Sequence, residues 1–238
     1  MKYPDRLVSL ANRWGLAYAR WICRREYRSQ IYTGFNERAV ELLFLFRQLA
    51  RYWPKTVLDV GTGTTSLPHL IRNCGFLVTA IDNIGDYWNY GIVNRHYHVL
   101  NDDITDSRLG ASFDFITCIS VLEHIENHGA ALRNIFRLLN PGGHAVLTFP
   151  YNEKKYVRNV YDLPGSDARV KYPFITQVFS RNELDAWLTE NDGTLIEQEY
   201  WRFYTGDYWT IGNMIDRPVR VDRNEPHHVS CVLIQKSG

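Results

Sequence analysis

A glycine-containing turn after an apolar run is the stretch of this sequence best suited to bind a nucleotide-like ligand. Residues 57–66 read VLDVGTGTTS, with Asp59 two residues before Gly61 and with Gly63 close behind. A dinucleotide-binding turn has a third glycine where Ser66 stands, because helix and strand must pack closely there. An acid ahead of the glycines would repel a pyrophosphate but could organise the loop around a cationic amino-acid group. The turn therefore favours a nucleoside cofactor over a dinucleotide, with a plain tight turn as the alternative.

Acidic residues also follow the next two apolar runs. Asp82 ends the run LVTAID and Asn83 comes next, whereas Asp103 and Ile104 follow the run YHVLND. A carboxylate is well suited to accept hydrogen bonds from two vicinal hydroxyl groups, so Asp82 is a candidate for binding a ribose. Solvated loops often carry acids such as Asp103, and only its position after a third strand favours a binding role.

Alternating strands and helices must hold these residues in place. Short runs rich in branched side chains predict strands over residues 56–60, 77–82, 97–102, 113–120, 144–150, 194–203 and 227–236. Helices are predicted between them, one capped near Ser66, one capped by Asn127, and one opened by a capping box of Ser180 and Glu183. The pattern predicts an α/β fold with a doubly wound, mostly parallel sheet of seven strands, whose ligands bind beyond the carboxyl ends of the strands.

Composition excludes several other classes of protein. A chain of 238 residues that is 45% hydrophobic can bury one large core, and its 27 basic and 26 acidic residues nearly balance. The four cysteines are scattered, with no paired spacing for zinc or redox chemistry. No apolar run approaches the roughly 18 residues of a membrane span, and no signal peptide is evident. These features predict a soluble, cytoplasmic protein.

From about residue 55 onward, the order and spacing of the motifs resemble the class I S-adenosylmethionine-dependent methyltransferases. VLDVGTGTT is similar to the glycine-rich first motif of that family, and FDFITCISVLEHI and LLNPGGHAVLTFP are similar to the motifs of its fourth and fifth strands. The resemblance implies S-adenosyl-L-methionine as cofactor and S-adenosyl-L-homocysteine as product, with Asp82 on the ribose and with Asp103 and Ile104 on the adenine. The cofactor-binding residues that it implies are Asp59, Gly61, Thr62, Gly63, Thr65, Asp82, Asn83, Asp103, Ile104 and Ser120.

Methyl transfer asks the protein mainly to align an acceptor with the methyl group and to exclude water. A hydroxyl acceptor also needs a base, for which the candidates are His124, Tyr151 and Asp162. Some relatives with a glutamate-x-x-glutamate-histidine pattern bind a metal at this point of the chain. Ser120 occupies the first of those positions and removes one hard oxygen ligand. We therefore expect no metal, and expect His124 to be either catalytic or packed.

Two long segments outside the common fold are expected to bind the acceptor. Residues 151–179 form an insertion after the fifth strand, and residues 200–218 add further aromatic side chains. Long loops at the ligand-binding edge usually carry specificity, although these aromatic residues could instead only pack the loops. Tyr151 is expected to lie nearest to the transferred methyl group because it is the first residue beyond the strand. The predicted acceptor-binding residues are Tyr151, Tyr156, Asn159 and Tyr161.

The first part of the chain is predicted to be a helical cap over residues 1–54, followed by one methyltransferase domain over residues 55–238. An arginine stripe runs along one side of the first helix beside an apolar stripe, and the first thirty residues hold seven basic and two acidic side chains. One interpretation is a packed helix whose basic face is solvated. The other is contact with an anionic partner or another subunit.

These observations predict methyl transfer to an oxygen or nitrogen atom of a small molecule, either a secondary metabolite or a sugar or glycan precursor. A nucleic-acid substrate is not expected, because the motif around Ser120 lacks the Asn/Asp-Pro-Pro-aromatic stretch of amino-directed DNA enzymes and the overall charge is balanced. Two alternatives stay open, a nicotinamide-dependent oxidoreductase and a non-catalytic module that keeps the cofactor as a ligand.

Overall fold

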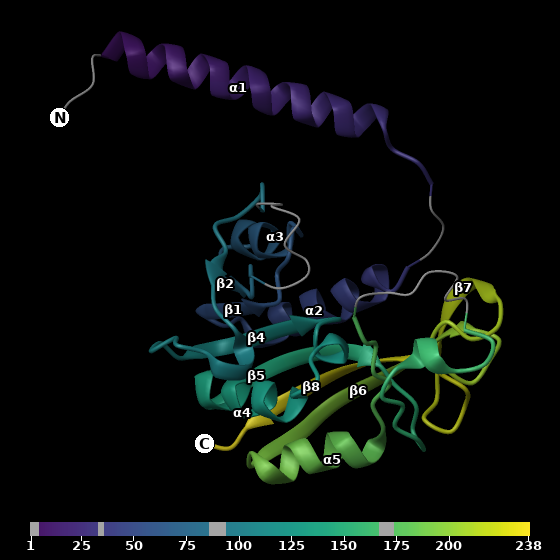
Figure 1. Cartoon of the computed structure of the whole chain (residues 1–238). Coiled ribbons are helices and arrows are strands. Elements are labelled where there is room, and N and C mark those ends of the chain that lie inside the picture. The colour runs from purple at the N-terminus through teal and green to yellow at the C-terminus, as the bar shows by residue number, and fades with distance from the viewer. Residues whose placement is uncertain (1–4, 33–35, 86–93, 167–173) are drawn as a thin grey trace. The chain divides into compact units, whose positions relative to one another are not determined.

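The computed structural model describes residues 5–32, 36–85, 94–166 and 174–238, and it divides into two units, residues 1–35 and 36–238. In the first unit, one helix, α1 (Asp5–Arg28), accounts for nearly all of the described residues (Figure 1). Almost all of its described side chains are exposed. The second unit holds a sheet and all of the other described helices.

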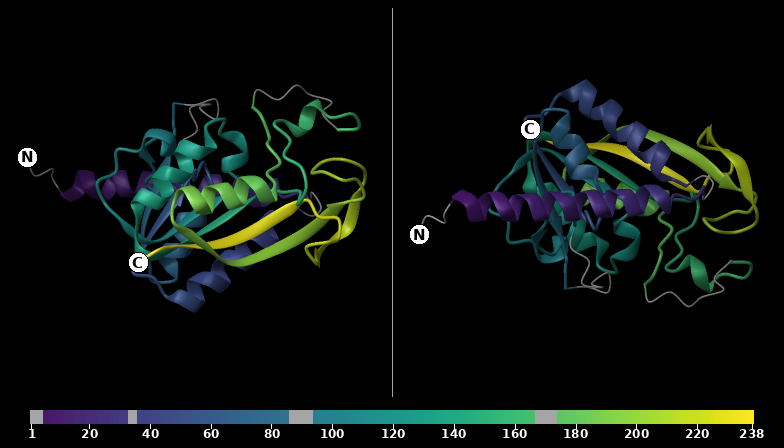
Figure 2. Two further views of the ribbon diagram at one scale, coloured as in Figure 1. Left: turned by 90° about the horizontal axis from the view of Figure 1, so that it is seen from below. Right: turned by 90° about the horizontal axis from the view of Figure 1, so that it is seen from above.

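The second unit is built on an eight-stranded sheet with the order β3-β2-β1-β4-β5-β8-β6-β7 (Figures 1 and 2). Neighbours from β3 to β5 pair in parallel, whereas β8 is antiparallel to both β5 and β6, and β7 is antiparallel to β6. The strands are β1 (Thr56–Val60), β2 (Leu77–Asp82), β3 (Leu100–Asn101), β4 (Phe113–Ile119), β5 (Leu139–Pro150), β6 (Gly193–Tyr204), β7 (Met214–Val221) and β8 (Val229–Lys236).

Four α-helices and three short 3₁₀ helices accompany the sheet in the described part of this unit. Their bounds are α2 (Arg38–Tyr52), α3 (Leu67–Asn73), α4 (His128–Leu138) and α5 (Arg181–Glu190), with η1 (Ile104–Asp106), η2 (Leu122–His124) and η3 (Val160–Asp162). The predicted caps are confirmed at α4, where Asn127 accepts from the Ala130 amide, and at α5, where Ser180 and Glu183 form a capping box. Ser66 precedes α3, although its side chain makes no capping hydrogen bond.

Alternate residues of the central strands point into two separate cores. Leu58 and Val60 of β1 are buried in a cluster that includes α4 and α5 residues such as Leu132 and Leu184. Val57, which directly precedes Leu58 and points to the other face of the sheet, is buried with residues of α2 and α3 such as Phe44 and Ile71. Strands covered by helices on both faces read as continuous apolar runs, which explains why these strands were recognisable in the sequence.

The predicted doubly wound, mostly parallel α/β fold is confirmed, but the sheet has eight strands rather than seven. The additional strand, β7, lies inside residues 200–218 and just beyond, where the sequence predicted a loop. Its side chains are exposed or half-buried throughout and Pro218 interrupts it, so it lacks the apolar run of a buried strand. Pairing with the edge of β6 supplies its stability instead.

Helix α2 belongs to the sheet unit, because the division of the structure falls after residue 35 rather than after residue 54. Phe44, Leu45 and Leu49 are fully buried against the sheet. The helix begins at Arg38 with Glu37 as the preceding cap residue, where the sequence indicated Asn36, and it ends at Tyr52, shortly before Pro54 as expected.

Candidate functional site

The glycine turn leaves the carboxyl end of β1 in a conformation that suits glycine. Gly61 has φ of +69° and Gly63 has φ of +55°, a region that other residues rarely adopt. A Cβ atom on Gly61 would also overlap the side chain of Val121, at 2.6 Å from Cγ1. Since Val121 directly follows Ser120 at the end of β4, this close approach ties the turn to the chain segment that carries Glu123 and His124.

Asp59 organises this turn from inside the protein. Its carboxylate is buried and accepts hydrogen bonds from the hydroxyl groups of Thr62 at 2.7 Å and Thr117 at 2.6 Å. Burial raises the pKa of Asp59 to about 6, although both hydroxyl groups act in the opposite direction. The hydroxyl group of Thr65 donates to the Thr62 carbonyl at 2.9 Å and so tightens the next turn of the loop.

Asp82 and Asn94 hold the loop from its outer side. The Gly63 amide donates to Oδ2 of Asp82, which ends β2. The Asn94 side-chain amide donates to the carbonyl oxygens of Gly63 and Thr65, at 2.9 Å each. Asn94 was not predicted from the sequence, because its partners are backbone atoms and it belongs to no recognisable motif.

Asp103 and Ile104 lie at the same carboxyl edge of the sheet. The Asp103 side chain caps η1 by accepting from the Thr105 amide and hydroxyl group, both at 2.8 Å, and Ile104 is buried beneath it. The Asp102 amide donates to the Asp82 carbonyl at 3.1 Å, which fixes the end of β3 beside the end of β2. Asn83 follows β2 and is exposed.

Ser120 connects the end of β4 to helix α2. Its backbone has φ of +50°, and its hydroxyl group donates to Oε1 of Glu41 at 2.6 Å. The same oxygen accepts from Thr148 at 2.7 Å, while Arg38 pairs with Oε2 at 3.0 Å. Burial raises the pKa of Glu41, and the Arg38 guanidinium opposes that rise. The buried Glu41 therefore connects α2 to the ends of β4 and β5 through hydrogen bonds.

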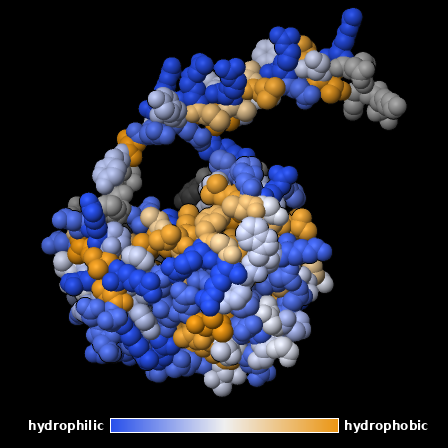
Figure 3. All heavy atoms as spheres, turned by 180° about the vertical axis from the view of Figure 1, so that it is seen from behind, coloured by the Kyte–Doolittle hydropathy of each residue, from blue (hydrophilic) through white to orange (hydrophobic). Residues whose placement is uncertain are grey.

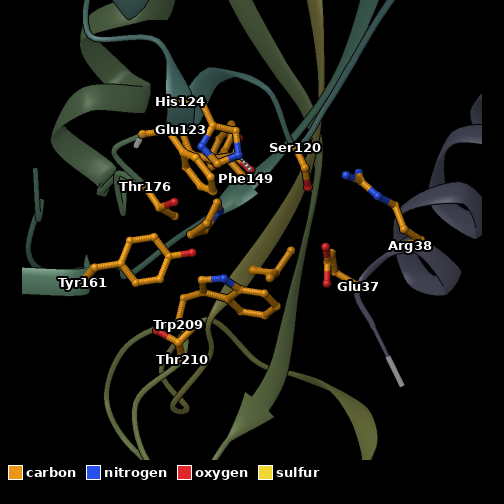
Figure 4. Close-up of a pocket in the computed structure, with 13 residues that line it drawn as sticks. Glu37, Arg38, Ser120, Glu123, His124, Phe149, Tyr161, Thr176, Trp209 and Thr210 are labelled. Atoms are coloured by element: carbon orange, nitrogen blue, oxygen red, sulfur yellow. Dashed lines mark ion pairs between the residues drawn. The ribbon is translucent and has the colours of Figure 1, made fainter. Parts of the chain in front are cut away.

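A cavity of about 290 Å³ opens next to Ser120, where β4 and β5 end (Figure 4). Its walls come from α2, from η2, and from the two long segments at residues 151–179 and 200–218. The lining residues are Glu37, Arg38, Ser120, Glu123, His124, Phe149, Pro150, Tyr161, Phe174, Thr176, Trp209, Thr210 and Val229. Its lining thus combines aromatic walls with two carboxyl groups, one guanidinium and one imidazole.

His124 presents a basic nitrogen in this lining. Its Nδ1 lies 2.8 Å from the Ile175 carbonyl oxygen. Because a carbonyl oxygen can only accept, Nδ1 carries the proton in this contact and Nε2 carries the lone pair. Burial lowers the pKa of His124, whereas the hydrogen bond to Ile175 raises it. The net lowering of the pKa favours the neutral ring, which is the form that a general base needs before it acts.

Glu123 is a buried acid beside that histidine. Its Oε1 lies 3.9 Å from Nε2 of His124 (Figure 4). Within the described ranges, its Oε2 is buried and has no hydrogen-bond partner. Burial raises the pKa of Glu123 to about 8, the Glu41 carboxylate adds to that rise, and Arg38 opposes it. A buried polar group without a partner is costly, so Glu123 is a group that a bound molecule would satisfy.

The structure brings only some of the predicted catalytic and acceptor residues to the cavity. His124 and Tyr161 line it, whereas Asp162 is exposed at the end of η3 and is not among the lining residues. The Asn159 side chain accepts from the Thr176 amide at 3.2 Å, and Tyr156 donates to Gln177 at 2.6 Å. Thr176 lines the cavity, whereas Asn159 and Tyr156 do not.

Tyr151 lies in the protein core rather than in the cavity. Its ring is fully buried, its hydroxyl group donates to Glu153 at 3.0 Å, and the Arg181 guanidinium lies 5.9 Å from the ring centre. Burial raises the pKa of Tyr151, so that it is poorly suited to act as a base. The expectation that Tyr151 lies nearest to the methyl group does not fit this placement, because its backbone pairs with the chain at Phe179 and continues the sheet.

The described part of the chain contains no group of three or more His, Cys, Asp or Glu side chains that could hold a metal ion. Within the same ranges, no helix combines the length and the apolar character that crossing a membrane requires.

The chain matches a family model, curated proteins and solved structures. The sequence model of a family described as "Methyltransferase domain" matches residues 32–198, more than half of the chain. The ubiquinone biosynthesis O-methyltransferase of Pseudomonas fluorescens is 29% identical over 147 residues, which cover 56% of this chain and 62% of that protein. The enzyme of the same name from Psychrobacter arcticus is 33% identical over 114 residues, or 43% of this chain and 44% of that protein. The chain thus spans less than two thirds of the length of these curated relatives.

Solved structures share the fold at lower identity. The 1,6-didemethyltoxoflavin-N1-methyltransferase of Burkholderia thailandensis, crystallised with its substrate and S-adenosylhomocysteine, has a TM-score of 0.57 and 17% identity, covering 100% of this chain and 92% of that chain. The magnesium protoporphyrin IX methyltransferase of Synechocystis has a TM-score of 0.51 and 14% identity, covering 99% of both chains. At this identity the likeness concerns the fold. The match of the family model over residues 32–198 shows that the chain belongs to the methyltransferase-domain family.

Proposed function

We propose that the chain binds S-adenosyl-L-methionine at the glycine loop and catalyses transfer of the methyl group to a hydroxyl group of a small molecule held in the cavity. The observation that carries this proposal is the contact of Gly61 with Val121, which sets the loop directly beside the segment holding Ser120, Glu123 and His124. A cofactor on one side and a base on the other would then share one edge of the sheet.

The residues at the glycine loop fit a nucleoside cofactor. Gly63 has open space where a Cβ would stand, with Oδ2 of Asp82 as the nearest atom at 3.9 Å. A ligand can therefore approach the backbone here and reach a carboxylate suited to vicinal hydroxyl groups. Asp59 would act through the loop, since its oxygens already accept from Thr62 and Thr117. Asp103 and Ile104 would border the base at the end of β3.

The cavity provides what an oxygen acceptor needs. When bound, the cofactor supplies a methyl group that its sulfonium already makes electrophilic. His124 would take the acceptor's proton at Nε2 while Nδ1 stays bonded to Ile175, which holds the ring in position. Aromatic side chains of Tyr161 and Trp209 would enclose the acceptor and exclude water. The cavity volume of about 290 Å³ favours an acceptor of modest size.

The names of the relatives support both kinds of acceptor atom. The curated relatives are O-methyltransferases, whereas the toxoflavin enzyme methylates nitrogen. We favour oxygen because the neutral His124 beside the carboxyl group of Glu123 offers a proton acceptor, which a neutral amine would not require. Secondary metabolites and sugar or glycan precursors stay the predicted acceptor classes, and the cytoplasmic location likewise stays a prediction.

Titration calorimetry with S-adenosylhomocysteine and with NADH tests the cofactor assignment. We expect heat of binding with the first and none with the second. Binding of NADH without binding of S-adenosylhomocysteine would overturn the proposal in favour of a nicotinamide enzyme. A panel of phenols, alcohols and amines, assayed for methylated product by mass spectrometry, then tests the acceptor. If the chain binds the cofactor and methylates amines but no phenol or alcohol, the acceptor atom is nitrogen rather than oxygen.

A further inference from the structure

Helix α1 carries a continuous apolar arc along a surface that the structure leaves exposed. At 3.6 residues per turn, one side of the helix gathers its largest apolar side chains within an arc of about 160°. Trp14 is 72% exposed, Tyr18 64% and Trp21 53%. Its members between positions 7 and 22, in order around the helix, are Leu10, Trp21, Trp14, Leu7, Tyr18, Ala11, Ile22, Gly15 and Val8. Beyond position 22, in the last turn, Arg25, Glu26 and Arg28 fall within the same angular range.

A basic stripe borders one edge of this apolar arc. Arg6, Arg13, Arg20 and Arg24 fall within about 40° of each other on the same helix. Residues 6–28 contain six arginines and one acid, Glu26, which gives a formal charge of six minus one, or +5, in a chain whose total is only +1. Figure 3 shows apolar side chains along one side of this helix and mainly hydrophilic ones along the other.

We propose that α1 binds the surface of an anionic lipid bilayer, lying in the plane of the membrane with its tryptophans inserted at the level of the headgroups. Tryptophan and tyrosine favour this boundary because their rings are apolar at one end and polar at the other. The arginine stripe at the edge of the apolar arc would contact lipid phosphates, as in interfacial amphipathic helices. Arg25, in the last turn, packs its guanidinium 5.8 Å from the Trp21 ring centre and can extend to the headgroups.

Charge favours a bilayer over a second copy of the helix. In an antiparallel pair of α1 helices joined through their apolar arcs, the arginine stripes would come close to each other, with Glu26 as the one acid between Arg6 and Arg28. Like charges at that distance repel. The apolar arc also lacks the regular aliphatic repeat of a coiled coil, because Ala17 and Arg24 follow Leu10 at intervals of seven. An anionic surface neutralises the same stripe.

Vesicle flotation of the full-length chain tests this inference. The vesicles are phosphatidylcholine alone, or phosphatidylcholine with one third phosphatidylglycerol. We expect flotation with the anionic vesicles, little with the neutral ones, and release of the protein by high salt. Replacing both Arg13→Glu and Arg20→Glu should weaken the affinity by at least about 25-fold, since each arginine near an anionic surface contributes about fivefold.

Matched variants test whether membrane binding depends on the apolar arc itself rather than on any change in hydrophobicity or net charge. Trp14→Ser with Trp21→Ser should abolish flotation, whereas Leu16→Ser, which removes a 66% exposed apolar side chain from the opposite side of the same helix, should not. Arg133→Glu on α4 controls for a change of net charge. Unchanged affinity for S-adenosylhomocysteine and an unchanged circular dichroism spectrum would show that each variant is folded.

Three results would overturn the inference. These are no flotation with either vesicle, equal flotation with neutral and anionic vesicles, and flotation that the tryptophan and arginine variants leave unchanged. Light scattering that shows a dimer of the free chain, lost in the tryptophan variant, would assign the helix to self-association if the wild type does not float.

Discussion

The glycine-loop edge and the cavity lie side by side, yet they are built in opposite ways. The glycine-loop edge comprises Asp59, the loop of residues 61–65, Asp82 and Asp103, and these three carboxylates accept hydrogen bonds from nearby protein groups. The cavity collects side chains from several separate stretches of the chain, and Oε2 of Glu123 is buried there without a hydrogen-bond partner among the described residues.

This difference shows how the two regions would be used. A loop that fixes its own backbone is preorganised for one unchanging ligand, such as a nucleoside cofactor. A cavity with an unsatisfied buried carboxyl group pays a cost in the free protein that a bound molecule can relieve. The following five experiments test whether the two regions separate in this way.

The largest expected effect is at the base of the cavity. His124→Ala should lower kcat about 10²- to 10⁴-fold, the usual contribution of a general base, while leaving the affinity for S-adenosylhomocysteine unchanged. Asp162→Ala is the control, because this residue is exposed and outside the cavity lining. Steady-state kinetics with any hydroxyl acceptor that the wild type methylates provides the measurement. An equal decrease of kcat in the Asp162 variant would show that Asp162 takes part in catalysis.

The second effect concerns the buried acid and the pH dependence of stability. Because the folded pKa of Glu123 is raised from 4.5 to about 8, its contribution to stability is full below pH 4.5 and is lost as the pH rises through 8. The difference in unfolding free energy between wild type and Glu123→Gln should change by on the order of 4 kcal/mol across that window.

Urea unfolding at several pH values measures this difference. Asp59, whose pKa is also raised, is present in both proteins and cancels, whereas Glu41 interacts with Glu123 and contributes to the measured difference. The charged groups nearest to Glu123 are Glu41, Glu37 and Arg38, and they are likewise common to both. A pH-independent difference would mean that Glu123 is ionised in the folded protein.

The third effect distinguishes two glycines of the same loop. Gly61→Ala should destabilise the protein by about 3 kcal/mol, because it combines a positive φ with overlap against Val121. Gly63→Ala has the positive φ without the overlap and should cost about 1 kcal/mol. Thermal unfolding measures both. Equal costs would show that the contact with Val121 is not tight.

The fourth effect is on cofactor affinity. Asp82→Ala should weaken binding of S-adenosylhomocysteine by about 1–3 kcal/mol, because ribose hydroxyl groups would lose their acceptor. His124→Ala should not change the same affinity. Calorimetry decides, and equal affinities of wild type and the Asp82 variant would place the ribose elsewhere.

The smallest effect is on acceptor binding. Tyr161→Phe should raise the KM of the acceptor by severalfold, the effect of one lost hydrogen bond of about 1 kcal/mol, with kcat nearly constant. Tyr156→Phe is the matched control, because its hydroxyl group is bonded to Gln177 outside the cavity lining. A higher KM in the Tyr156 variant alone would place the acceptor beside Tyr156 rather than beside Tyr161.

The parts of the fold that follow local rules were predictable. The buried strands read as apolar runs, and Asn127, Ser180 and Glu183 lie within three residues of the backbone groups that they cap. The β7 strand was not predicted, because an edge strand with exposed or half-buried side chains has no apolar run to reveal it.

The sequence by itself determined the glycine-loop edge. Parallel strands bring their carboxyl ends to one edge of the sheet, so residues following successive strands, such as Gly61, Asp82 and Asp103, must meet there. Their roles in binding the cofactor stay predictions, but their common location follows from chain order alone.

Only the tertiary structure decided the cavity. Tyr151 and Tyr161 look equivalent in the sequence, yet one is buried in the core and the other lines the cavity. Arg38 and Glu123 are far apart in the chain and meet only because α2 packs against the ends of β4 and β5 through Glu41. The side on which a loop residue faces depends on packing between distant segments, and no periodicity along the chain records such packing.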